Sequence, residues 1–250
     1  MVGPYSVIDA DVVLGPDCWL GPHVYLTGRT LIGKGNRFFS GAVVGEAPQD
    51  LKYKGDPSGL RIGDHNTFRE HCTIHRANFT GEETVIGSHN LFMASCHLAH
   101  NCVVGDSTII VNAALLAGHV TVGNRAVISG NCLVHQFIRI GTLAMMQGGS
   151  AVSKDLPPYT VARGDNHICG LNTIGLRRAG FTAEQRLELR QTYHLLFRSG
   201  QSLQSACALA AKKFSGEHAR HLLEFVASAK RGVCTDIGSG DDEAENEEAD

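Results

Sequence analysis

The sequence predicts a mainly β protein, a parallel β-helix of hexapeptide repeats that is followed by a C-terminal α-helical domain. An apolar residue recurs at every sixth position throughout Val85–Leu156, and the same period is already present from Val2 onward. A period of six fits neither an amphipathic helix nor an alternating strand. It is typical of hexapeptide β-helices. After about residue 182 the period changes to patterns that favour helices.

The β-helix domain is expected to cover residues 1–158, with loop insertions at 49–60 and 79–84. Both insertions are multiples of six residues, so the register should continue unchanged across them. Three hexads make one triangular coil, and positions 18 apart should therefore stack. Glycines often follow the apolar position, where we expect the chain to turn a corner. The polar segment 49–60 is long for a structureless loop, which makes it a candidate part of a functional site.

The repeat is expected to end at Pro157-Pro158, because proline cannot donate to a sheet ladder. We then expect a connector over residues 159–181 and a helical domain over 182–234. Thr182 can cap a first helix that runs to about Arg198. Two further helices are predicted over Leu203–Phe214 and Glu217–Lys230. The acidic tail, 235–250, is expected to be disordered because it has little to bury.

Composition narrows the function classes. The 250 residues carry a net charge of −3, which gives no sign of nucleic-acid binding. No apolar run approaches the roughly 18 residues that span a bilayer, so no stable membrane insertion is expected. The start of the chain lacks a signal-peptide pattern, and a cytoplasmic location is expected. Five cysteines share one hexad position and should be buried, reduced thiols: Cys18, Cys72, Cys96, Cys102 and Cys132.

Histidines cluster within the longest run of repeats, at His97, His100, His119 and His135. Gly118 lies 18 residues after His100, so the two should stack. A glycine there would leave room for a substrate, and its N–H could stabilise an oxyanion. A neutral imidazole is a suitable general base for activating a hydroxyl. The cluster therefore indicates catalysis more than a solvated surface.

Other interpretations of the cluster remain open at this point. Histidines from adjacent subunits could bind zinc, as in γ-class carbonic anhydrases, and metal analysis would distinguish that case. The chain could also be a non-catalytic scaffold. A covalent route through Cys96 or Cys102 is disfavoured, because an inward-facing thiolate would be costly. No metal and no cofactor is part of the favoured interpretation.

The chain resembles the UDP-N-acetylglucosamine 3-O-acyltransferases of lipid A synthesis. The resemblance rests on GEAPQDLKYKGDP, TIHRAN, HLAHNCVVG, LAGHVTVG, LVHQFIRIG, DLPPY and GLNTIGLRRAGF, in order from Gly45 to Phe181. It implies a left-handed β-helix and a homotrimer with sites between subunits. It further implies the first step of lipid A biosynthesis, in which acyl carrier protein donates a 3-hydroxyacyl chain to the glucosamine 3-hydroxyl of UDP-N-acetylglucosamine. A 3-amino sugar nucleotide or a related N-acyltransferase reaction remains an alternative.

The resemblance also implies roles for residues. His100 would be the general base and Gly118 the oxyanion donor, with no acyl-enzyme. Gly148 would set acyl-chain length, although the sequence does not give the length itself. Basic residues near the cleft, such as Arg139, Lys154 or Arg163, could dock the acidic carrier protein. Substrate binding is expected from Asp50, Lys52, His97, His119, His135, Gln136, Asn172 and Arg178.

One departure concerns the catalytic motif. Members of the family often carry Asp after the catalytic histidine, whereas this chain has Asn101. We therefore expect that no carboxylate raises the basicity of His100, although an amide carbonyl could still orient its ring.

Overall fold

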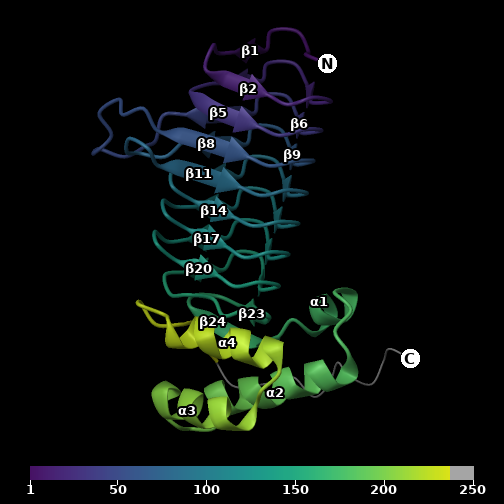
Figure 1. Cartoon of the computed structure of the whole chain (residues 1–250), viewed down its shortest axis with the longest axis vertical. Coiled ribbons are helices and arrows are strands. Elements are labelled where there is room, and N and C mark those ends of the chain that lie inside the picture. The colour runs from purple at the N-terminus through teal and green to yellow at the C-terminus, as the bar shows by residue number, and fades with distance from the viewer. Residues whose placement is uncertain (237–250) are drawn as a thin grey trace.

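The computed structural model describes residues 1–236. Over this range the chain forms a left-handed parallel β-helix with helices packed at its C-terminal end (Figure 1). Val7 pairs with Tyr25 and Leu91 with Ile109, so an uninterrupted coil takes 18 residues, as the hexad pattern predicts. Strands on the three sides of each coil stack into three sheets.

Sheet 1 contains β1 (Val7–Ile8), β4 (Tyr25–Leu26), β7 (Val43–Glu46), β10 (Thr73–His75), β13 (His97–Leu98), β16 (Leu115–Leu116), β19 (Leu133–Val134) and β22 (Ala151–Val152). Sheet 2 contains β2 (Val12–Leu14), β5 (Arg29–Ile32), β8 (Gly59–Ile62), β11 (Glu83–Ile86), β14 (Val103–Val104), β17 (Thr121–Val122) and β20 (Arg139–Ile140). Sheet 3 contains β3 (Trp19–Leu20), β6 (Arg37–Phe38), β9 (Thr67–Phe68), β12 (Leu91–Phe92), β15 (Ile109–Ile110), β18 (Val127–Ile128), β21 (Met145–Met146), β23 (Thr160–Ala162), β24 (His167–Leu171) and β25 (Thr235–Asp236).

The two insertions leave the register unchanged, as predicted. Val43 pairs with Thr73 across the first insertion, and Thr73 pairs with His97 across the second. Both loops leave the β-helix between sheet 1 and sheet 2 and project on the same side of the molecule (Figure 1). They therefore lie beside the corner that follows β13, where His100 and Asn101 lie.

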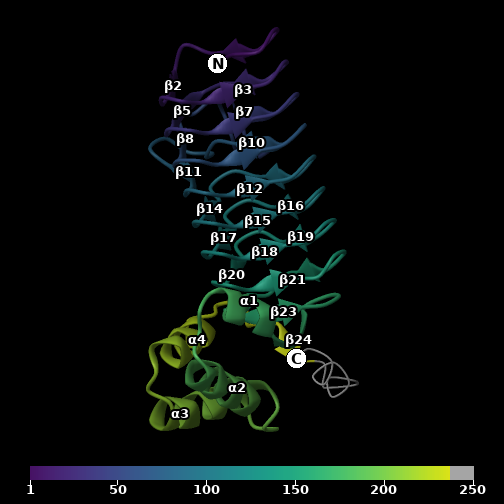
Figure 2. The same cartoon turned by 90° about the vertical axis from the view of Figure 1, so that its right-hand side faces the viewer.

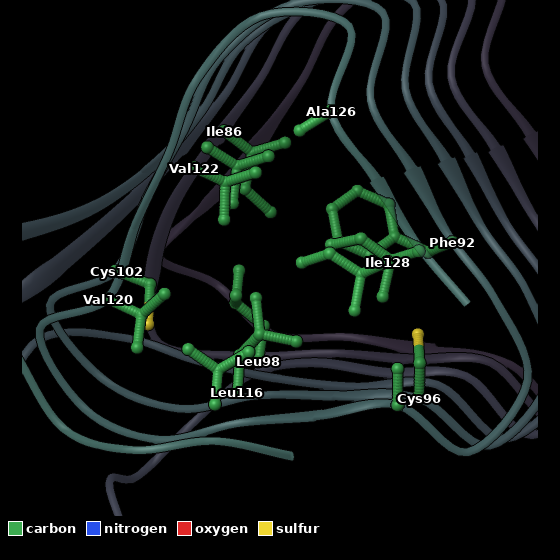
Figure 3. Packing of buried hydrophobic residues seen from close by; sticks show 14 of the residues in the cluster. Ile86, Phe92, Cys96, Leu98, Cys102, Leu116, Val120, Val122, Ala126 and Ile128 are labelled. Carbon is green, nitrogen blue, oxygen red and sulfur yellow. The ribbon is translucent and has the colours of Figure 1, made fainter. Parts of the chain in front are cut away.

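The core consists of the apolar residues at the second position of each hexad. Figure 3 shows them pointing inward from the three walls of the coil, with Ile86 and Val122 on one wall and Leu98 and Leu116 on another. Burial of each such side chain contributes about 1.5–3 kcal/mol relative to exposure. The five cysteines at the sixth position are buried as well, which confirms that prediction.

The glycines that follow the apolar position have a different cause from the one expected. The corners turn two residues later, at the fifth hexad position, where residues such as Asn101 and His119 adopt positive φ. Gly15 and Gly33 are instead required by close approach: a Cβ on Gly15 would lie 2.6 Å from the carbonyl carbon of Gly33. The first coil departs from the rule that the second hexad position is buried. Val2 and Ile8 occupy that position but have no preceding coil to pack against, and they remain exposed.

The strands continue past Pro157-Pro158, so the expected end of the repeat there is wrong. Met145 pairs with Val161, and this last coil is therefore shorter than the others. The shortening breaks the hexad pattern, while the prolines lie in a corner and do not interrupt a ladder. Strands β23 and β24 and the short helix α1 (Thr173–Arg178) together occupy much of the segment that was expected to be a connector.

The C-terminal helices form a small second core under the β-helix (Figure 2). They are α2 (Ala183–Phe197), α3 (Leu203–Lys213) and α4 (Glu217–Ala227), each within three residues of its predicted bounds. Thr182 caps α2 through a reciprocal capping box with Gln185. No helix within residues 1–236 has both the length and the apolar character needed to cross a bilayer.

The segment after α4 returns to the β-helix. Thr235 and Asp236 form β25 beside β24, so the expected disorder does not begin at Thr235. The Asp236 carboxylate accepts hydrogen bonds from Tyr193 Oη at 2.7 Å and Arg198 Nε at 2.6 Å. Residues 237–250, the remainder of the predicted tail, lie outside the described residues.

Candidate active site

A cavity of about 610 Å³ runs along the outer face of sheet 1. It begins at the corner after β13 and follows the β-helix toward its C-terminal end. The predicted residues His97, His100, Gly118, His135 and Gln136 all line it. The structure therefore brings together residues from three successive coils, as the 18-residue spacing predicts.

His100 lines this cavity and has only 7% of its surface exposed. Its Nδ1 lies 2.8 Å from Asn101 Oδ1, and its Nε2 lies 3.9 Å from Asp50 Oδ2. One ring nitrogen is thus engaged by the following amide. The other nitrogen is left for chemistry in the cavity.

Gly118 stacks directly on His100. A Cβ at position 118 would lie 2.6 Å from His100 Cε1 and 2.7 Å from Nε2, so a larger residue would collide with the imidazole. Gly118 has no positive φ, and close approach is therefore the reason for glycine here. Among the described residues, no backbone carbonyl accepts a hydrogen bond from the Gly118 N–H. That N–H remains able to bind a ligand oxygen.

Three neighbouring histidines are held neutral by burial. Burial lowers the pKa of His97, and proximity to His100 lowers it further. The same two causes, in the same order, lower the pKa of His119. Burial also lowers the pKa of His75, to about 4. A proton acquired by His100 would therefore have no charged imidazolium beside it in the resting site.

The first insertion reaches the cavity and His100. The Asp50 carboxylate accepts hydrogen bonds from the Lys52 N–H at 3.0 Å and from Asn78 Nδ2 at 2.8 Å. These bonds lower the pKa of Asp50, so its negative charge is maintained close to His100 Nε2. Lys52 itself is exposed and does not line the cavity. Gln49, not singled out from the sequence, also lines the cavity.

His119 is near the site without lining the cavity. Its ring lies edge-on to His100 with centroids 5.2 Å apart and stacks on Phe137 at 4.6 Å.

The remaining predicted residues lie elsewhere in the chain. Asn172 is buried as the N-cap of α1, where its side chain bonds the Gly175 N–H and the Leu143 carbonyl oxygen. Arg178 is exposed at the end of that helix. Gly148 is exposed in the corner between β21 and β22 and does not line the cavity. Within one chain these three are not joined to His100.

The suggested carrier-docking role of Arg139 conflicts with its contacts. Arg139 is held by Asp155 at 2.7 Å and bonds the Phe225 carbonyl oxygen of α4. It packs the helices against the β-helix and does not present a free cation.

Besides Gln49, sequence reasoning missed two further residues near His100. His75 is buried, and its ring lies edge-on to His97 with centroids 4.8 Å apart. Glu82, in the second insertion, accepts a 2.5 Å hydrogen bond from Asn101 Nδ2. A carboxylate is therefore linked to His100 through the Asn101 amide, by two successive hydrogen bonds. The clue was positional: the second insertion directly precedes the coil that carries His100.

Known proteins are similar to this chain in sequence and in structure. Residues 155–234 match a family model described as UDP N-acetylglucosamine O-acyltransferase, domain 2. The chain is 43% identical to the acyl-[acyl-carrier-protein]–UDP-N-acetylglucosamine O-acyltransferase of Thermodesulfovibrio yellowstonii, over 94% of this chain and 96% of that protein. It is 50% identical to the protein of the same name from Psychromonas ingrahamii, over 87% of this chain and 84% of that one.

Solved structures show the same likeness. The Francisella novicida UDP-N-acetylglucosamine acyltransferase superposes with a TM-score of 0.89 and 36% identity, over 94% of this chain and 88% of that one. The Campylobacter jejuni UDP-N-acetylglucosamine acyltransferase gives a TM-score of 0.85 and 33% identity, over 94% of both chains. On the strength of its sequence over almost its whole length, this chain belongs to the acyl-[acyl-carrier-protein]–UDP-N-acetylglucosamine O-acyltransferase family.

Proposed function

We propose that this protein transfers a 3-hydroxyacyl chain from acyl carrier protein to the glucosamine 3-hydroxyl of UDP-N-acetylglucosamine, with His100 as general base. The observation that carries the proposal is the stacking of Gly118 on His100 at one end of an apolar cavity. Membership of the family supplies the substrate class. The geometry supplies a base and an oxyanion donor at the same point.

In the proposed reaction His100 Nε2 accepts the proton of the sugar 3-hydroxyl as its oxygen attacks the thioester carbonyl carbon. The Gly118 N–H donates to the resulting oxyanion, which is the role in which such donors contribute most. Collapse of the tetrahedral intermediate breaks the carbon–sulfur bond. The leaving thiolate of the carrier protein then takes the proton from His100, which restores the neutral imidazole.

No acyl-enzyme is needed in this reaction. Cys102, the nearest cysteine in sequence, points into the core, and burial raises its pKa to about 12. Cys96 is buried too, and its contact with Cys72 together with burial raises its pKa far above neutrality. Neither thiol has the thiolate character that a nucleophile requires.

The acyl chain is proposed to lie along the cavity beyond His100. Leu115, Leu133 and Ala151 follow one another along its floor, each one coil further from His100. Leu115 and Leu133 expose 44% and 50% of their surface in the single chain. This apolar wall would be covered by an acyl chain and by a second copy of the protein.

A homotrimer with its sites between subunits completes the proposal. Asn172 and Arg178 do not meet His100 within one chain, so a role in nucleotide binding requires a neighbouring copy. Sugar and diphosphate contacts are assigned to Asp50, Lys52, His97, His119, His135 and Gln136. A cytoplasmic location accords with the buried, reduced thiols along the β-helix.

The acyl-length role of Gly148 has a direct test. A Cβ at this position would meet only the Gly130 carbonyl oxygen, at 3.5 Å, so Gly148→Met should fold. If this residue limits the acyl chain, the variant will prefer shorter 3-hydroxyacyl carrier proteins than the wild type. An unchanged chain-length profile would remove Gly148 from the site.

The central experiment is acyl transfer by His100→Ala. Removal of a general base costs about 10²–10⁴-fold in rate, so we expect kcat to fall by at least two orders of magnitude. His89→Ala is the matched control, because His89 is an exposed corner histidine of the preceding coil that stacks on His65. Near-normal turnover of the folded His100→Ala protein would refute the mechanism. Parallel assays with the 3-amino analogue of the sugar nucleotide would decide between hydroxyl and amine acceptors.

A further inference from the structure

Glu82 is joined to the base of the site by a short chain of hydrogen bonds. Its carboxylate accepts from Asn101 Nδ2 at 2.5 Å, and Asn101 Oδ1 lies 2.8 Å from His100 Nδ1. The Asn101 backbone is held by a bond from its N–H to Thr84 Oγ1 at 2.8 Å. Glu82 precedes β11 in the second insertion, so a loop residue reaches a catalytic histidine through one amide.

The bonding pattern fixes which way the Asn101 amide points. Its Oδ1 also accepts from the Asn78 N–H at 3.1 Å, while its NH₂ group faces the Glu82 carboxylate. A carboxylate can only accept hydrogen bonds and a backbone N–H can only donate. If the amide were flipped, Asn101 Oδ1 would face the Glu82 carboxylate, and the Asn101 NH₂ group would face the Asn78 N–H. Both contacts would be repulsive.

The orientation of the amide in turn sets the tautomer of His100. Because Asn101 Oδ1 is an acceptor, Nδ1 of His100 must carry the hydrogen. Nε2 is then left with its lone pair, close to Gly118 and Asp50. A general base needs that lone pair at the nitrogen that faces the substrate. In the opposite tautomer Nε2 would carry a proton and could not accept one.

We propose that Glu82 is a positioning residue that fixes the orientation of the Asn101 amide and, through it, the His100 tautomer with a free lone pair on Nε2. Glu82 also supplies the negative charge that a carboxylate next to His100 would otherwise provide. The inference rests on the proposed function of His100. It assigns a role in the reaction to the second insertion.

Other charged and titratable groups surround His100 and must be considered with Glu82. They come from the first insertion, the coil before, the coil of His100 itself and the coil after: Asp50, Lys52, His75, His97 and His119. The three histidines are neutral near pH 7, and Asp50 is ionised. Glu82 thus adds a second negative charge, on the Nδ1 side of the ring, opposite Asp50 on the Nε2 side. Both favour the imidazolium that forms during proton transfer.

The first test is Glu82→Gln in the full-length protein. Replacing a charge-assisted hydrogen bond by a neutral one should lower kcat about fivefold. KM for the sugar nucleotide should change less than twofold, because Glu82 does not line the cavity. Loss of the negative charge should also move the acid limb of the kcat/KM profile to lower pH. Glu83→Gln is the matched control, since Glu83 is an adjacent exposed carboxylate that pairs with Arg61.

The second test repeats Glu82→Gln in an Asn101→Asp background. The introduced aspartate would place a carboxylate against Glu82, whereas a glutamine in place of Glu82 could donate its NH₂ group to that aspartate. We therefore expect the sign of the effect to reverse, with Glu82→Gln lowering kcat beside Asn101 and raising it in the Asn101→Asp background. A purely structural role for Glu82 predicts the same loss in both backgrounds, and that result would overturn the proposal.

A third readout separates this proposal from the proposed function. Imidazole ¹³C and ¹⁵N shifts of labelled histidine identify the His100 tautomer, with His100→Gln to assign its signals. We expect the Nδ1–H form in the wild type at about pH 7.5 and a mixture of tautomers in Glu82→Leu, which leaves the Asn101 NH₂ group without its acceptor. An Nε2–H form in the wild type, or an unchanged tautomer in the variant, would refute the positioning role. If the wild type lacked acyl transfer, only the proposed function would fall, because the tautomer is measured without turnover.

Discussion

His75 is the residue that most clearly shows what the neighbours of His100 contribute. It is buried beside His97, and within residues 1–236 its Nδ1 has no hydrogen-bond partner. Burial lowers its pKa to about 4, and the nearby His97, His100 and Arg76 add to the shift. A buried imidazole that stays neutral keeps the space around His100 free of a competing positive charge.

This shift predicts a pH dependence of stability. An unfolded histidine titrates near 6.5, so between about pH 6.5 and 4 the unfolded chain binds a proton that folded His75 does not. The contribution of neutral His75 to the free energy of unfolding is therefore fully present above about pH 6.5. It is lost as the pH falls toward 4, by up to about 3 kcal/mol. Urea unfolding at about pH 7.5 and about pH 5, at one protein concentration, should show a smaller loss for His75→Gln than for the wild type. His89→Gln, an exposed control, should behave like the wild type; equal losses in all three proteins would contradict the prediction.

The 18-residue repeat predicts the position of some site residues and not of others. Gly118 follows from counting 18 residues on from His100, because uninterrupted coils repeat strictly. Glu82 lies in an insertion, where no periodicity places a side chain, so its contact with Asn101 emerges only in three dimensions. His75 lies within the TIHRAN motif, yet nothing in the sequence indicated that it lies against His97.

At the scale of elements, the join between the β-helix and the helices depends on Arg139. This residue of β20 reaches Asp155 and also bonds Ser228 Oγ and the Phe225 carbonyl oxygen, both at 3.0 Å. Its guanidinium lies over the Phe225 ring, 4.3 Å from the centroid. Asp155 is only 3% exposed, so it depends on this pairing.

Arg139→Ala should therefore weaken the docking of α4. Removing one partner of a buried ion pair costs about 3–5 kcal/mol, because the remaining charge is left without compensation. We expect a lower urea midpoint and earlier proteolysis of residues 200–230 than in the wild type. Arg163→Ala is the control. Arg163 is exposed, and within residues 1–236 its side chain makes a hydrogen bond only to the Gln147 side chain. Similar midpoints for the two variants would show that Arg139 does not hold the helices.

Elements were predictable wherever local rules repeat. The strands follow from the hexads, even across both insertions, and α2 follows from the Thr182 capping box. The prediction that the repeat ends at Pro157-Pro158 failed, because a shortened coil changes the hexad spacing without ending the sheet. Sequence prediction failed again at Thr235, where pairing with β24 outweighs the polar character of the segment.

At the scale of the whole molecule, one chain holds only part of the proposed site. His100 and Gly118 lie on the β-helix, whereas Arg178 lies on α1 and does not line their cavity. The exposed leucines on sheet 1 mark an apolar surface that is open in the single chain. In the proposed homotrimer, a neighbouring copy would cover that surface and would supply Arg178 to the cavity.

This arrangement predicts complementation between two inactive variants. His100→Ala and Arg178→Ala should each lose most acyl transfer at low sugar-nucleotide concentration. In a mixed trimer, one interface combines an intact His100 from one copy with an intact Arg178 from the next. Purified mixed trimers should therefore recover roughly a third of the wild-type sites, because each mixed ring regains one interface of three. The measurement is acyl transfer by co-expressed trimers that carry two different tags and are purified on both. Recovery distinctly above either parent supports a shared site, whereas activity no greater than that of the parents would contradict a site to which one copy gives His100 and the next gives Arg178.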